Sequence, residues 1–93
     1  KLIKKFALKF LEDGSYETLK NALENGNGEE AFRAAHTLKG VCMNLGLENL
    51  YKPSAELTEK LRGREAAGCE ELFAQVQAEY EKTVKAIDQL DRD

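Results

Sequence analysis

Residues 27–46 read NGEEAFRAAHTLKGVCMNLG. At 100° per residue, seven of its apolar residues fall within about 60° of Leu38 on a helical projection. They are Ala31, Ala34, Ala35, Leu38, Val41, Cys42 and Leu45. Asn27 is suited to cap this helix, with Glu30 reaching back as in a capping box, and Gly46 is suited to end it. The pattern predicts an amphipathic helix with one face buried.

The same projection places His36, the chain's one histidine, about 160° from Leu38 and so on the solvent side. Lys39 follows it at i+3 and Gly40 at i+4, so a cation and a gap in the side-chain surface adjoin the ring. Phe32 and Met43 project about 120° and 140° from the core direction and flank His36. We interpret them as a docking surface, with burial against a neighbouring helix as the alternative.

Four further segments of the sequence carry helical patterns. Apolar spacing predicts a first helix over residues 2–12, and Ser15 is a good N-cap for a second that ends at Asn25-Gly26. A fourth helix follows Gly46, runs to Arg62-Gly63 and is expected to kink between Asn49 and Pro53. A fifth begins near Glu65 or Cys69 and ends at Leu90. Short connections and the absence of strand patterns predict an all-α fold: an antiparallel up-and-down four-helix bundle with an additional N-terminal helix.

The bulk composition limits the classes of function. With 93 residues, the chain is expected to form one domain over 1–93. A net charge of -3 disfavours nucleic acid and anionic membranes as partners. No apolar run reaches the length of about 20 residues that spans a bilayer, and no secretory signal is evident, so we expect a cytoplasmic location. We take a monomer as the default. Cys42 and Cys69 are then expected to be buried thiols.

Several catalytic classes are excluded by spacing. Cys42 lies about 120° around the helix from His36, which disfavours a Cys/His nucleophile pair. One histidine and two separated cysteines cannot close a zinc site, and no glycine-rich nucleotide loop occurs, so no metal or cofactor is expected. A solitary imidazole beside a lysine suits the acceptance and donation of a phosphoryl group. Lys39 would lie against the phosphoryl oxygens, Arg33 at i-3 would assist, and Gly40 would leave the approach open.

The run Ala35-His36-Thr37-Leu38-Lys39-Gly40, followed by Gly46-Leu47, Leu50 and Leu57, resembles the histidine-containing phosphotransfer (HPt) domain family. The resemblance covers nearly the whole chain. It implies that His36 receives a phosphoryl group from an aspartate of a response-regulator receiver domain and passes it to another receiver. It also implies a phosphoryl carrier without kinase activity of its own, and a sensor histidine kinase, in the same polypeptide or a separate one, as a further partner. Many members carry a glutamine on the following helix that reaches the histidine; by position that site is Thr58 here.

Three alternatives remain open at this point. The N-terminal phosphotransfer domain of chemotaxis-type histidine kinases shares the His-Thr-Leu-Lys-Gly signature, and its phosphoryl donor would be a kinase ATP domain. A non-catalytic module that binds receivers is the second. A phosphohistidine phosphatase is the third, although no carboxylate or amide beside His36 is evident for activating water.

Overall fold

The computed structural model describes Phe10, residues 13–63 and residues 65–92 of the chain. These residues form four α-helices and one 3-10 helix: α2 (Ser15–Glu24), α3 (Gly28–Leu45), α4 (Glu48–Lys60), η1 (Leu61–Gly63) and α5 (Glu70–Arg92). The helix predicted over residues 2–12 lies, apart from Phe10, outside the described residues. The all-α prediction is confirmed for the described part, as a bundle of four helices.

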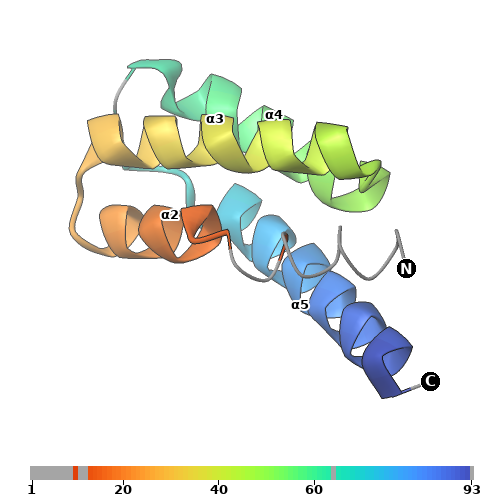
Figure 1. Ribbon diagram of the computed structural model, residues 1–93. Helices are drawn as coiled ribbons and strands as arrows, with labels where there is room; N and C mark the ends of the chain where they lie inside the picture. Colours follow the sequence, from red (N-terminus) through yellow and green to blue (C-terminus); the bar gives the residue numbers. More distant parts are fainter. Residues whose placement is uncertain (1–9, 11–12, 64, 93) are drawn as a thin grey trace.

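Each helix packs on the next one along the chain, α2 on α3, α3 on α4 and α4 on α5. Figure 1 shows the chain reversing direction at each connection, so that sequence neighbours lie antiparallel. Aromatic side chains close the bundle between its first and last helices. The Tyr16 ring on α2 stacks on the rings of Tyr80 and Phe73 on α5. The distances between ring centroids are 3.8 Å and 5.8 Å, respectively. One face of α3 therefore packs against α2, α4 and η1, and the opposite face is exposed to solvent.

The two ends of α3 are fixed by the residues that the sequence indicates. The Asn27 side chain accepts a hydrogen bond from the Glu30 backbone N–H at 3.1 Å. The Glu30 carboxylate accepts from the Asn27 side-chain amide at 3.2 Å, rather than from the backbone as in a full capping box. Gly46 ends the helix with a φ of 71°, which an L side chain rarely adopts, and the Leu47 N–H bonds the Cys42 carbonyl at 2.9 Å. α3 is thus held in register at both ends.

The start of α2 differs from the prediction. Gly14, not Ser15, occupies the N-cap position, and Ser15 is the first helical residue. The Asp13 carboxylate accepts hydrogen bonds from both the Ser15 N–H, at 2.8 Å, and the Ser15 hydroxyl. Asp13 therefore supplies the anionic oxygen at this helix start, and the Ser15 hydroxyl is a donor to that carboxylate rather than a capping acceptor.

Helix α4 continues through Pro53 without interruption and passes into η1 at Leu61. Proline cannot donate a hydrogen bond to the carbonyl of Asn49 one turn earlier, but Asn49 is exposed, so water has access to this part of the helix. Helix α5 begins at Glu70, next to Cys69, which agrees with the later of the two predicted starts.

One apolar core lies between the helices. Leu19, Leu38, Leu50, Leu57, Leu61 and Val76 are its largest buried aliphatic residues, and Phe10 joins them. Cys42 and Cys69 are buried free thiols, as predicted. Burial raises the pKa of the Cys42 thiol to about 11, and the nearby Ser54 hydroxyl opposes part of that rise. This thiol is therefore held protonated and unreactive in the core.

Candidate functional site

His36 lies in the middle of α3 and is exposed. Its neighbour Ala35 and the residue two positions on, Leu38, are buried, so the helix turns its apolar face inward and its imidazole outward. The predicted outward position of His36 is confirmed. A group on another molecule can approach this ring without any rearrangement of the bundle.

Phe32 supports the imidazole from one turn earlier. The two ring centroids are 6.3 Å apart and the planes are inclined by 43°, a spacing typical of interacting aromatic pairs. Phe32 is half-buried: part of its side chain packs against the core and part is exposed to solvent. The contact gives His36 an apolar wall on the side facing the start of α3.

Arg62, in the 3-10 helix η1 that follows α4, lies over the Phe32 ring. Its guanidinium carbon lies 5.9 Å from the Phe32 ring centroid, within cation–π range. Glu59 accepts from two nitrogens of Arg62, at 3.1 Å from Nε and 2.6 Å from Nη2. The end of α4 is thereby connected to the His36 side of α3.

Lys39 is half-buried and lies one helical turn after His36. The hydrogen bond from Arg62, together with the positive charges of Arg62 and Lys39, lowers the pKa of the Glu59 carboxyl. Lys39 is thus within electrostatic reach of the last turn of α4. Of the two cations, Arg62 on η1 binds the Glu59 carboxylate directly, and Lys39 on α3 acts on it only through its charge.

Gly40 faces open space. A Cβ built at this position would meet nothing within 4 Å outside its own helix backbone, so close helix packing does not explain the glycine. A gap in the side-chain surface therefore exists one turn beyond the imidazole, as the sequence predicted.

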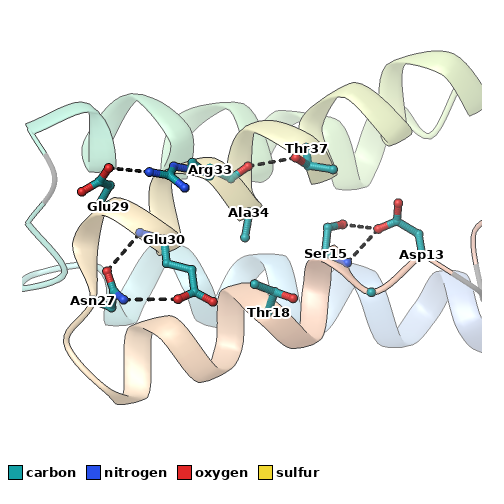
Figure 2. Close-up of a pocket in the computed structure, with 10 residues that line it drawn as sticks. Asp13, Ser15, Thr18, Asn27, Glu29, Glu30, Arg33, Ala34 and Thr37 are labelled. Atoms are coloured by element: carbon teal, nitrogen blue, oxygen red, sulfur yellow. Dashed lines mark hydrogen bonds and ion pairs between the residues drawn. The ribbon is translucent and has the colours of Figure 1, made fainter.

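Arg33 is engaged elsewhere. Its guanidinium pairs with Glu29 at 2.5 Å, and both side chains are largely exposed. Figure 2 shows Arg33 directed along α3 toward Glu29, at the edge of an open groove of about 630 Å³ between α2 and α3. Thr37 lines the same groove and its hydroxyl donates to the Arg33 carbonyl at 3.0 Å. In this arrangement Arg33 is held by a carboxylate one turn before it.

Met43 lies two turns after His36 and is 60% exposed, the large apolar side chain most open to solvent among the described residues. It borders a shallow pocket of about 480 Å³ between the end of α3 and the start of α4. Leu47 and Tyr51 form much of the apolar lining. The structure thus leaves Met43 uncovered and available for contact.

Thr58 is not at the surface. It is fully buried, and its hydroxyl donates to the Ser54 carbonyl of its own helix at 2.7 Å. A side chain this short, already bonded within α4, does not present a polar group to a partner beside His36. The expected binding role of Thr58 is therefore not supported; the contact that joins the end of α4 to this part of α3 runs from Glu59 through Arg62 of η1 to Phe32.

Sequence reasoning missed Glu59 and Arg62 because Arg62 was interpreted only as part of the helix end. The i, i+3 spacing of an acid and an arginine in the last turn indicates an ion pair. Nothing in that spacing shows that the pair lies against Phe32. That information comes from the packing of α4 on α3.

Among the described residues, no group of three or more His, Cys, Asp or Glu side chains is placed to hold a metal ion. No helix in the described ranges is long and apolar enough to cross a membrane.

Comparison with known proteins adds one finding. The family model described as Hpt domain matches residues 13–89, which includes all of α2, α3 and α4 and most of α5. No curated protein and no solved structure gives a significant match to the chain.

Proposed function

The chain belongs to the Hpt domain family, whose members perform histidine phosphotransfer in phosphorelays, and from this premise we propose that His36 is the residue that carries the phosphoryl group. The observation that supports the proposal most is the exposed imidazole on the outer face of α3, with Lys39 and an open glycine position one turn away. It is the chain's one histidine.

The proposed reaction needs few groups from this chain. A nitrogen lone pair of His36 attacks the phosphorus of a phosphoaspartate on a receiver domain. The nitrogen–phosphorus bond forms, the bond from phosphorus to the aspartyl oxygen breaks, and the electron pair leaves with the aspartate carboxylate. Transfer to the next receiver reverses these steps with a new aspartate as acceptor.

Charge and space are the contributions of the neighbouring residues. The transferring group carries negative charge on its equatorial oxygens, and Lys39 supplies a positive charge within one turn of His36. Gly40 leaves room for those oxygens and for the loop that delivers them. Neither residue makes or breaks a covalent bond.

Phe32 and Met43 are the apolar part of the proposed docking surface for the receiver. One is half-buried and the other exposed, and they flank His36 along α3. Contacts of this kind exclude water and set orientation, while the charged groups nearby select the partner. We propose receiver domains as the direct partners and a sensor histidine kinase as the upstream source of phosphate.

The test is transfer from a radiolabelled, phosphorylated receiver to the isolated domain. We expect label that is stable in base and lost in acid, as expected for phosphohistidine. The His36→Gln variant should acquire no label while keeping its helical circular dichroism, since the side chain is outside the core. A matched control, Asn44→Ala, changes another exposed polar residue of α3 and should be labelled normally.

A second step separates the relay from its alternatives. The labelled domain, freed of the donor, should pass its phosphoryl group to a second, unlabelled receiver. Receiver binding without labelling, across a panel of receivers, would contradict the carrier role and leave an interaction module. Labelling only by a kinase ATP domain would assign the chain to the chemotaxis type.

A further inference from the structure

Beside His36 lies a contact network whose members make and break no bonds in the proposed phosphoryl transfer. It consists of Phe32 on α3, Glu59 on α4 and Arg62 on η1. Glu59 binds Arg62 through two hydrogen bonds, Arg62 lies over the Phe32 ring, and Phe32 contacts the imidazole. We propose that Arg62 is a positioning residue, which acts through Phe32 to restrict the orientation of the His36 ring; the inference rests on the proposed function of His36.

The geometry of Arg62 favours positioning over a purely electrostatic role. A guanidinium that is planar and held by a bidentate carboxylate can cover an aromatic face, which a lysine ammonium does less well. The Glu59 partner fixes the plane of the guanidinium. Arg62 and Glu59 side chains are both 61% exposed, so the pair contributes little to folding stability.

The His36 side chain needs such a restraint because it is exposed. An imidazole in solvent changes rotamer freely, and reaction requires the nitrogen to face the incoming phosphorus. Thr58, the position from which the resemblance implied a direct contact, is buried with its hydroxyl on Ser54. In this chain the contact from the α4 side reaches His36 indirectly, through Arg62 and then Phe32.

The first test observes the ring without any phosphoryl transfer. The proton shifts of His36 depend on the nearby Phe32 ring, and we expect Arg62→Ala to move them and to broaden the distribution of imidazole rotamers measured by NMR. Glu59→Gln should produce a smaller change in the same direction. Lys82→Ala, which breaks a similar i, i+3 pair with Glu79 on α5, is the matched control and should leave His36 unchanged.

The second test uses single-turnover transfer from a phosphorylated receiver. Arg62→Ala should lower the maximal rate about threefold to tenfold, with little change in the receiver concentration for half-maximal rate. Arg62→Lys, which keeps the charge, should recover less than half of the lost rate. Circular dichroism and thermal unfolding check that the variants remain folded.

Three results would overturn the inference. They are unchanged His36 shifts in Arg62→Ala, full recovery of rate by Arg62→Lys, and an effect confined to the half-maximal concentration. Full recovery by Arg62→Lys would mean that only the positive charge of Arg62 matters. An effect confined to the half-maximal concentration would mean that Arg62 contacts the receiver. Failure of the wild-type domain to accept phosphate would instead refute the proposed function, and the NMR comparison would still decide whether Arg62 positions the ring.

Discussion

At the scale of residues, His36 and its neighbours differ in how they are held. Phe32 packs against the core and lies under the Arg62 guanidinium, whereas a Cβ at Gly40 would meet only open space. A lysine on a flexible stem can move toward a phosphoryl group as it arrives. The site therefore combines a ring supported by Phe32 with a charge on a long side chain, and substitutions at the two kinds of residue should have different kinetic effects.

Lys39→Ala should slow transfer to His36 on the order of tenfold while changing receiver affinity little, since the charge acts mainly on the transferring group. Single-turnover kinetics over a range of receiver concentrations separates the two quantities. Lys39→Arg, which keeps the charge, should retain most of the rate. Equal maximal rates for wild type and Lys39→Ala would remove the electrostatic role of Lys39.

Substitutions of Gly40 should affect folding stability and the rate of phosphoryl transfer differently. Gly40→Ala should raise the free energy of unfolding by up to about 1 kcal/mol, because alanine is the better helix former and its Cβ enters open space. Gly40→Leu should also fold, yet slow transfer by about tenfold or more, because the larger side chain occupies the approach to the ring. Chemical denaturation and transfer rates measure the two effects. A rate unaffected by leucine would show that the open position has no part in transfer.

At the scale of elements, α3 is the part of the fold that the sequence specifies most completely. Its apolar stripe, its Asn27 cap and its terminal Gly46 were all predicted, because each depends on residues within the helix or next to it. The start of α2 was predicted wrongly at the cap: Gly14 occupies the N-cap position, and the Asp13 carboxylate before it accepts the Ser15 N–H.

Asn27→Ala should lower the free energy of unfolding by about 1 kcal/mol, because the Glu30 N–H at the start of α3 loses its side-chain acceptor. For a domain of this size the melting temperature should fall by roughly 4–8 °C. Asn44→Ala, at an exposed position within the same helix, should change it far less. Equal effects of the two substitutions would mean that the Asn27 cap contributes nothing specific.

At the scale of the whole molecule, the site depends on how α4 packs against α3. The positions of His36, Lys39 and Gly40 relative to one another follow from the geometry of one helix, and so could be predicted from spacing. Which residue of α4 lies beside them depends on the side-chain packing of two helices, which no periodicity specifies. The resemblance implied Thr58 as the residue that reaches His36, whereas the structure buries Thr58 and places Arg62 of η1, bound to Glu59, over the Phe32 ring.

The buried Cys42 gives the bundle a predictable dependence on pH. The folded state raises the pKa of this thiol from 9.0 to about 11. The folded protein thus holds the proton more tightly than the unfolded chain. This contribution is fully present below pH 9 and declines as the pH rises from 9 to 11.

Relative to Cys42→Ala, the wild-type free energy of unfolding should fall by about 1 to 2 kcal/mol across that interval under reducing conditions. Urea denaturation at several pH values measures the difference between the two proteins, which removes the shared contributions of Tyr16, Cys69 and Tyr80, whose pKa values burial also raises. Parallel curves for wild type and variant would show that Cys42 is not buried as described.

The most direct measurement of the central claim is to locate the phosphoryl group after the domain has reacted with a phosphorylated receiver. Phosphorus NMR and mass spectrometry under basic conditions should find it bonded to an imidazole nitrogen of His36, and should find none in His36→Gln. Phosphate that remains on the receiver, or appears on any residue other than His36, would show that His36 is not the phosphoryl carrier.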